Sequence, residues 1–433
     1  MLARAPSFFP LMPRFSFSRI LSALLPAGVM LVGAATAHAQ APRPVPAYEL
    51  PPINYSKATA SDAVARLQQR FDRGELTLEG TGRDLLLRVL KELQVPVESQ
   101  ALVFTKTSLQ KDLISPATPR AVYFSESIYV GWIPGGAIEV AALDPVLGPV
   151  FYTLDASERR KTAGGFRRDN SCLLCHGYFY MRDVPALFAV TTFPDLTGNP
   201  LPYAEQDLVD DVMPFSRRWG GWYVTGYTGE EPHRGNAFGT GTTKQNIKFT
   251  PNTQRPAELS GFFDTSRYPA ATSEALTLLV FEHQMAMQTT LVRASQLALR
   301  TELYSVTSIL DRLLFRRAAL LPEGIVRSEG FLKTFMSDAK RSRAGDSLKD
   351  IALDGRLFRN RCSYLIYSET FTALPAKLKH DVLDRLYAVL HDDSPSSRYA
   401  YLPKEERQRI YQILLETHPA ARERFEILAS ASN

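Results

Sequence analysis

Five consecutive residues near the middle of the chain constrain its fold most: Cys172-Leu-Leu-Cys175-His176. Cys-x-x-Cys-His is the attachment signature of a c-type haem, whose vinyl groups are attacked by the two thiols. Two intervening residues put both sulfurs on one side of a short turn, and His176 can then reach the iron as the proximal ligand. A chain built on this motif has to cover one large, apolar, covalently held haem c.

Two other readings of the same residues stay open. Cys172, Cys175 and His176 could join Cys362 in a structural zinc site, which would make the protein a zinc-stabilised binding module. The two cysteines could also form a thioredoxin-like redox pair. The chain has three cysteines in total, fewer than a disulfide-stapled secreted domain would show. A haem would use two of them and leave Cys362 as a buried apolar side chain.

The N-terminal residues 1–39 have the pattern of a secretory signal peptide. Three arginines precede an apolar run over 20–32, and Ala37-His38-Ala39 supplies a small-x-small cleavage site. We predict cleavage after Ala39 and a periplasmic protein without stable membrane insertion, although an uncleaved anchor is the alternative. Export favours the haem interpretation, because covalent haem attachment takes place outside the bacterial cytoplasm.

Charge and length restrict the class of partner. The formal charge of the 433 residues is +5, and loss of the three signal-peptide arginines leaves about +2. No basic patch indicates binding to nucleic acid. We expect the partner to be a redox protein or a small electron donor or acceptor.

The hydrophobic pattern predicts an α+β fold with four sequence regions. After the signal peptide come a Pro-rich tether over 40–57, an α+β haem-attachment region over 58–270, and a helical region over 271–433 that packs over the haem. The antiparallel, β-rich N-terminal and middle part carries the haem motif. The C-terminal part is all-helical.

Periodicity assigns the individual elements. Five short strands are expected directly upstream of the motif, at 101–104, 121–124, 128–133, 137–142 and 148–154. Two more are expected at 184–193 and 219–227, within a long loop region that we predict wraps the haem. Helices are expected at 58–73, 83–93, 273–301, 303–318, 347–358, 376–391, 403–417 and 420–430.

Several stretches resemble a family of uncharacterised bacterial periplasmic proteins described as cytochrome c domain-containing, with a single Cys-x-x-Cys-His motif. The similarity runs over most of the mature chain. The stretches that carry it include Tyr129-Val-Gly-Trp132, Phe151-Tyr-Thr-Leu-Asp155, Arg218-Trp-Gly-Gly-Trp-Tyr-Val-Thr-Gly226, Glu282-His-Gln284 and Arg361-Cys-Ser-Tyr-Leu-Ile-Tyr-Ser368. The resemblance implies a haem protein but brings no reaction with it.

The ligand on the far side of the iron must come from elsewhere in the sequence, unless that position is open. His283 is the first candidate, because apolar residues stand three, four and seven positions before it and four after it on a predicted helix. Its alternative role is that of a core histidine bonded to a protein group. His233, in a loop after a Trp/Tyr strand, and Met213, before a proline, follow in that order.

These observations favour a periplasmic monohaem c-type cytochrome that transfers single electrons and uses Cys172, Cys175, His176 and His283. Whether it is an enzyme stays open. A peroxidase-like haem enzyme or gas sensor with an open iron is the alternative from a different class. Arg217 and Arg218 could pair with the haem propionates. No Ser-His-Asp order or paired-carboxylate spacing stands out.

Overall fold

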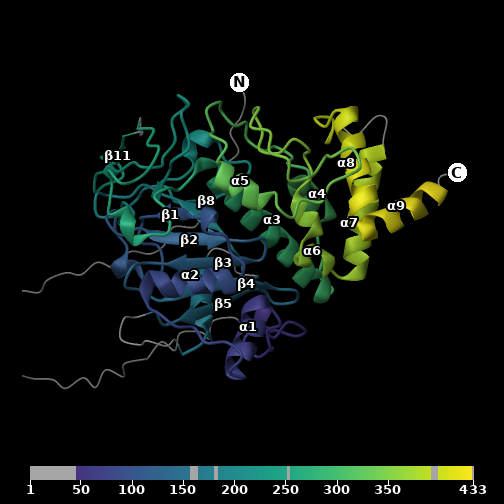
Figure 1. Ribbon diagram of the computed structural model, residues 1–433. Coiled ribbons are helices and arrows are strands. Elements are labelled where there is room, and N and C mark those ends of the chain that lie inside the picture. The colour runs from purple at the N-terminus through teal and green to yellow at the C-terminus, as the bar shows by residue number, and fades with distance from the viewer. Residues whose placement is uncertain (1–44, 157–163, 180–183, 251–253, 392–397, 432–433) are drawn as a thin grey trace, which may run out of the picture. The chain divides into compact units, whose positions relative to one another are not determined.

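An antiparallel sheet of seven strands forms the centre of the N-terminal and middle part of the protein (Figure 1). Its strand order is β6-β5-β4-β3-β2-β1-β9, so consecutive strands lie side by side until the last position. The strands are β1 (Ala101–Val103), β2 (Arg120–Phe124), β3 (Ile128–Trp132), β4 (Ile138–Asp144), β5 (Gly148–Leu154), β6 (Arg167–Arg168) and β9 (Trp222–Tyr223). Two small sheets pair β7 (Ala189–Thr191) with β8 (Asp207–Val209) and β10 (Gly239–Thr240) with β11 (Lys248–Phe249).

The computed structural model describes residues 45–156, 164–179, 184–250, 254–391 and 398–431. The expected signal peptide and its cleavage site lie outside these ranges, as do the first residues of the expected tether. From residue 45 that segment is packed rather than free, because Tyr48, Ile53 and Tyr55 are buried in the core. The Tyr55 hydroxyl donates to the carbonyl of Pro149 over 2.7 Å.

Both faces of the central strands are covered. Every residue of β3 is buried, and so is nearly every residue of β5. Helix α1 (Ala63–Asp72) contacts β4, and α2 (Gly82–Glu92) lies in front of the strands in Figure 1. Asp62 begins α1 by accepting hydrogen bonds from the amides of Val64 and Ala65. Apolar residues on both faces explain why these strands have little polar alternation.

The helical part begins with α3 (Ala275–Leu299), a long helix that is buried on almost all sides. It lies between the sheet and the later helices, and it contacts α4 (Val306–Leu313) and α6 (Glu369–Thr372) (Figure 1). The remaining helices are α5 (Glu329–Phe335), α7 (Ala376–His391), α8 (Lys404–Thr417) and α9 (Pro419–Ala431), of which the last three pack together. No helix in the described ranges combines the length and apolarity that a membrane crossing requires.

The α+β class with a helical C-terminal part is confirmed, and the five strands upstream of the motif begin and end within about two residues of their expected positions. The helix expected at 347–358 is wrong. That segment has turns and isolated bridges, because Leu353 and Gly355 adopt left-handed backbone conformations and Asp350 accepts a hydrogen bond from the Ser347 amide. The later strands expected at 184–193 and 219–227 shorten to β7 and β9.

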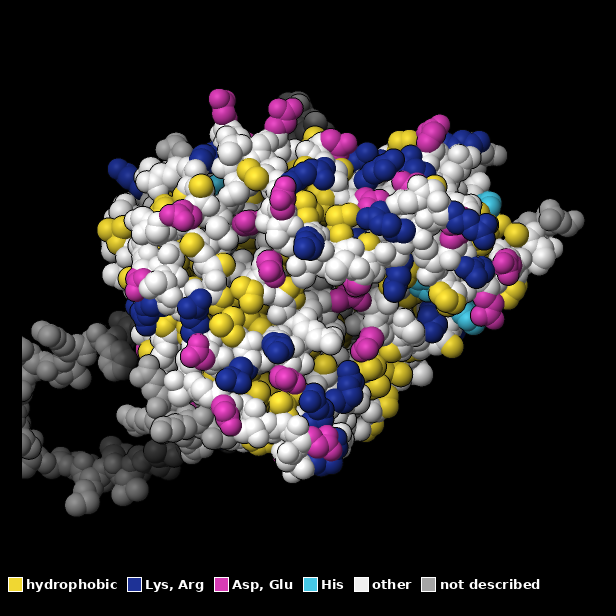
Figure 2. All heavy atoms as spheres, in the orientation of Figure 1, with side chains coloured by type: hydrophobic (Ala, Val, Ile, Leu, Met, Phe, Trp, Pro, Cys, Tyr) yellow, Lys and Arg dark blue, Asp and Glu magenta, His cyan; other side chains and the backbone are white. Residues whose placement is uncertain are grey.

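Lys/Arg and Asp/Glu side chains are interspersed over the face shown in Figure 2. Charges of both signs therefore alternate there rather than forming one field of a single sign.

Candidate haem site

A cavity lies between one face of the large sheet and helix α3. It contains about 1570 Å³ of space between atoms, part of which is continuous with solvent. The sheet contributes residues that share one face of the pleat, among them Val122, Tyr129, Gly131, Ala141 and Phe151. The rest of the lining comes from the Cys-x-x-Cys-His turn, from residues 187–190 around β7, and from two side chains of α3.

The Cys-x-x-Cys-His motif forms two successive turns. Asp169 accepts a hydrogen bond from the Ser171 amide and so begins a 3₁₀ turn over Asn170–Cys172. A wider π-helical turn follows over Leu174–Phe179. Cys172, Cys175 and His176 all line the same cavity, so the structure brings together the three residues that the motif singled out.

The imidazole of His176 is held in a defined orientation. Its Nδ1 lies 2.8 Å from the carbonyl oxygen of Ala186, and the Ala186 amide donates to the His176 carbonyl over 2.8 Å. Because a carbonyl can only accept, Nδ1 carries the proton and Nε2 keeps its lone pair. The ring packs between Phe151 and Phe188, at 4.8 and 4.7 Å between centroids. This is the tautomer that a ligating histidine needs.

Burial sets the protonation of the motif. It lowers the pKa of His176 to about 4, against the smaller opposing effect of the Ala186 carbonyl, so the ring is neutral near pH 7. Burial, together with Asp169 and Glu139, raises the pKa of Cys172 to about 12, and burial also raises the pKa of Cys175. A thioredoxin-like pair has a depressed thiol pKa, so these thiols do not have the electrostatics of that class.

The residue after the motif is fixed by packing. A Cβ added to Gly177 would lie 2.7 Å from the hydroxyl oxygen of Tyr48. The N-terminal segment around Tyr48 therefore packs against this turn, and only glycine at position 177 leaves room for the Tyr48 ring.

An ion pair on the sheet, which sequence reasoning missed, also faces the cavity. Arg120 on β2 donates to Glu139 on β4 over 2.6 Å, and the guanidinium crosses β3 at Gly131. A Cβ at Gly131 would meet that guanidinium at 2.1 Å, so the glycine makes the crossing possible. The sequence signal that could have revealed this pair is the presence of two charged residues in strands whose other residues are mostly apolar.

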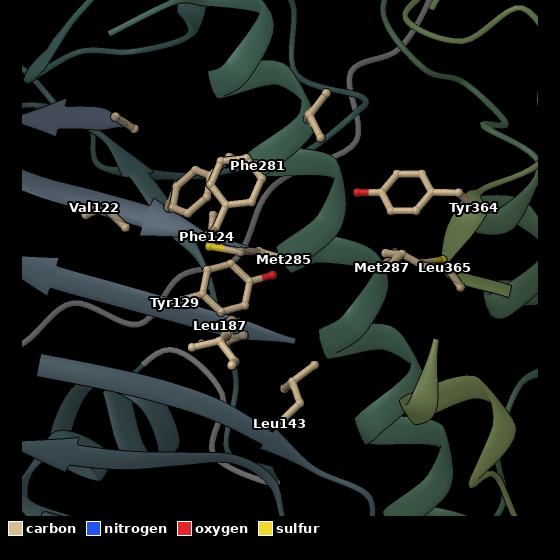
Figure 3. Close-up of a cluster of buried hydrophobic side chains, with 14 of the residues drawn as sticks. Val122, Phe124, Tyr129, Leu143, Leu187, Phe281, Met285, Met287, Tyr364 and Leu365 are labelled. Atoms are coloured by element: carbon tan, nitrogen blue, oxygen red, sulfur yellow. The ribbon is translucent and has the colours of Figure 1, made fainter. Parts of the chain in front are cut away.

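Helix α3 closes the cavity with Phe281 and Met285, which are one turn apart (Figure 3). One turn further, the hydroxyl of Thr289 donates to the Leu187 carbonyl over 2.8 Å and accepts from the Leu187 amide over 3.1 Å. The segment that holds His176 through Ala186 is therefore also attached to α3. Met285 was not among the candidate ligands, since apolar periodicity does not separate it from other buried methionines.

His283 does not line this cavity, although it lies on the same helix. Its Nδ1 is 3.1 Å from both carboxylate oxygens of Asp211, and its Nε2 is 2.8 Å from the hydroxyl of Ser363. The ring stacks on Phe315 at 4.4 Å between centroids. Protein groups thus occupy both ring nitrogens, and we do not propose His283 as an iron ligand. Asp211, two residues after β8, belongs to this group.

Asp211, His283 and Ser363 have the hydrogen-bond order of a hydrolase triad, but Ser363 and His283 are fully buried and neither lines a cavity found beside them. The Ser363 hydroxyl also caps the 3₁₀ turn Tyr364–Tyr367 by accepting from the Leu365 amide. A substrate could not reach this serine, so we assign the arrangement a structural role.

The other two candidate ligands are also enclosed elsewhere. Rings of Phe215, Trp219 and Tyr227 surround His233, whose Nδ1 accepts a hydrogen bond from the Gly235 amide over 3.1 Å. Burial lowers the pKa of His233 to about 4. Met213 is buried, and its carbonyl accepts from Arg218. Neither side chain lines the cavity of Cys172, Cys175 and His176.

The two arginines considered for propionates have protein partners. Arg218 pairs with Glu282 at 2.5 Å, and both side chains are buried. Arg217 pairs with Glu205 and Asp207 at the surface. Neither arginine lines the cavity, whereas Trp222 of the neighbouring strand does.

Cys362 is fully buried, burial raises its pKa, and it does not line the cavity of Cys172 and Cys175. In the described ranges, no group of three or more His, Cys, Asp or Glu side chains has an arrangement that could hold a metal ion. The four-residue zinc site therefore receives no support from the geometry.

No protein-family model matches the chain, and the comparisons with curated proteins and with solved structures likewise return no match.

Proposed function

We propose that this protein is a periplasmic monohaem c-type cytochrome that transfers single electrons to or from a redox partner. The observation that carries the proposal is the convergence of Cys172, Cys175 and His176 on one cavity, with Nδ1 of His176 bonded to Ala186. Two thiols and an imidazole with a free Nε2 are the groups that covalent haem attachment uses.

The residues of the cavity suit a haem. The cavity volume that is comparable with other ligand sites, about 410 Å³, lies within the 300–1,000 Å³ typical of small-molecule sites, and further space is continuous with solvent. Val122, Leu187 and Phe281 offer apolar contact, while Lys106 and Ser108 belong to a partly exposed side where propionates could meet water. A bound haem would supply an iron that cycles between two oxidation states. His176 would hold that iron, and the apolar wall would exclude water from it.

A haem enzyme or gas sensor is the second candidate, and one observation favours it. The Arg120–Glu139 pair faces the cavity with a guanidinium and a carboxylate, which could donate to or accept from a small ligand on an open iron. The ligand state of the iron separates this candidate from the electron carrier.

The test is the mass of the exported protein made together with a haem-maturation system. We expect one added haem that resists acid-acetone extraction, and its complete loss in Cys172→Ala/Cys175→Ala. Cys362→Ala is the matched control, because this cysteine is buried outside the cavity, and it should keep the haem. An unmodified wild-type mass would refute the proposal.

A further inference from the structure

Few side chains of the cavity wall could bind an iron opposite His176. Among the described lining residues, Met285 is the methionine and His176 the histidine. The lining tyrosines are engaged: Tyr129 donates to Gln288 on α3, and Tyr152 donates to Asp62 over 2.6 Å. A tyrosine that donates its proton to a protein acceptor does not present a phenolate to a metal.

The charged groups of the wall are also unsuited to the iron. Lys106 is partly exposed, and a lysine ammonium group is a donor without a lone pair for a metal. The Glu139 carboxylate is held by Arg120 over 2.6 Å. The thioether of Met285 has no hydrogen-bond partner in the described structure, and a thioether is a soft ligand that suits haem iron.

Met285 is buried on the sheet side of α3. Figure 3 shows it beside Tyr129, Phe281 and Leu187, whereas Met287 lies on the other side of the helix beside Leu365. The Met285 side chain is 3% exposed, although it lines the cavity, so it is held within the wall.

The segment that orients His176 is also connected to α3 by hydrogen bonds. Thr289, one turn after Met285, binds both backbone groups of Leu187. Ala186, the residue before Leu187, accepts a hydrogen bond from Nδ1 of His176 and donates one from its amide to the His176 carbonyl. A short chain of hydrogen bonds thus links the backbone that orients His176 to the helix that carries Met285.

We propose that the sulfur of Met285, together with Nε2 of His176, would hold the iron of a haem bound in this cavity. This rests on the proposed function, since it needs a haem on Cys172 and Cys175. Ligation by this thioether would close the iron to external ligands and would raise its reduction potential relative to two imidazoles. It therefore favours the electron carrier over the enzyme or sensor with an open iron.

The test compares Met285→Leu with Met287→Leu in haem-loaded protein. Both changes replace a buried methionine on α3 with a side chain of similar volume, so stability should fall little in either. Met285→Leu should turn low-spin haem high-spin, abolish the long-wavelength band of a methionine-ligated ferric haem, and let the ferrous iron bind carbon monoxide. Met287→Leu should keep the wild-type spectrum. Met285→His should restore a low-spin spectrum at a lower potential.

The outcomes are distinguishable. Wild-type protein without covalent haem refutes the proposed function itself. Wild-type protein with haem that is already high-spin, or a low-spin spectrum that survives Met285→Leu, refutes Met285 as ligand and leaves the haem proposal standing. A change in Met287→Leu equal to that in Met285→Leu would also refute it, because the effect would then come from the helix rather than from the sulfur.

Discussion

Helix α3 has two buried sides that differ in how their polar groups are satisfied. On the sheet side, Phe281 and Met285 face a cavity and offer it carbon and sulfur. On the other side, His283 is bonded to Asp211 and Ser363. The neighbouring Glu282 pairs with Arg218.

The comparison separates a polar core from a ligand site. A buried histidine needs partners for two nitrogens, and here the protein supplies both from segments far away in the sequence. A ligand site is instead recognised by atoms that the protein leaves without partners beside a cavity. Apolar surroundings alone do not distinguish the two sides, because α3 is buried almost all round.

The largest expected effect is on the polar side. His283→Ala should lower the free energy of unfolding by about 2–4 kcal/mol, since it opens a cavity against Phe315 and leaves Asp211 and Ser363 without their partner. Denaturant titration measures this. The haem spectrum should stay unchanged, the reverse of the result for Met285→Leu. A high-spin spectrum in His283→Ala would contradict this assignment and indicate that His283 binds the iron.

Acid should lower the free energy of unfolding through Asp211, which lies on the polar side of α3. Burial alone would raise the pKa of Asp211, but His283 and the guanidinium groups of Arg312 and Arg218 outweigh it and bring the pKa to about 2. A carboxyl whose pKa is depressed in the folded state stabilises the fold above its unfolded pKa of about 4. That contribution, about 2 kcal/mol, is lost as the pH falls from about 4 to about 2.

Unfolding of Asp211→Asn and wild type over this pH range measures the effect. The difference in unfolding free energy between them should shrink as the pH falls. Asp210→Asn is the matched control, because Asp210 pairs with Arg312 nearer the surface. A difference that stays constant from pH 6 to about 2 would mean that the carboxylate of Asp211 is not stabilised by its neighbours.

The smallest effect is expected at Cys362, next to Ser363. Cys362→Ala should cost about 1–2 kcal/mol, because the thiol is fully buried and its loss leaves a small void. Denaturant titration checks the stability and absorption spectroscopy checks the haem, which should be unaffected. Loss of haem from this variant would contradict the assignment and would support a metal site that includes Cys362.

Local patterns were sufficient for the sheet but insufficient for the later loops. The strands upstream of the motif have turn signals between short apolar runs, which fix their ends locally. The segment 347–358 has apolar residues at helical spacing, yet Leu353 and Gly355 adopt positive φ values of 61° and 89°. Those conformations depend on tertiary packing, which periodicity does not record.

The residues of the candidate site also differ in whether local sequence patterns could predict them. Cys172, Cys175 and His176 were predictable because their spacing alone encodes a reactive turn. The partner that sets the tautomer of His176 is the Ala186 carbonyl, and a backbone group carries no signature in the sequence. His283 was ranked first because its helix face is apolar, but Asp211 and Ser363 lie 72 and 80 residues away and only the fold brings them to it.

The glycine at position 131 has a consequence for how this cavity could change over evolution. Its missing side chain is the gap through which Arg120 reaches Glu139 across a fully buried strand. Any larger residue there would displace the guanidinium and leave a carboxylate alone in the floor of the cavity. One substitution more than forty residues from the Cys-x-x-Cys-His motif would thus shift the floor from neutral towards negative, and a negative floor would favour the oxidised state of a metal centre bound there.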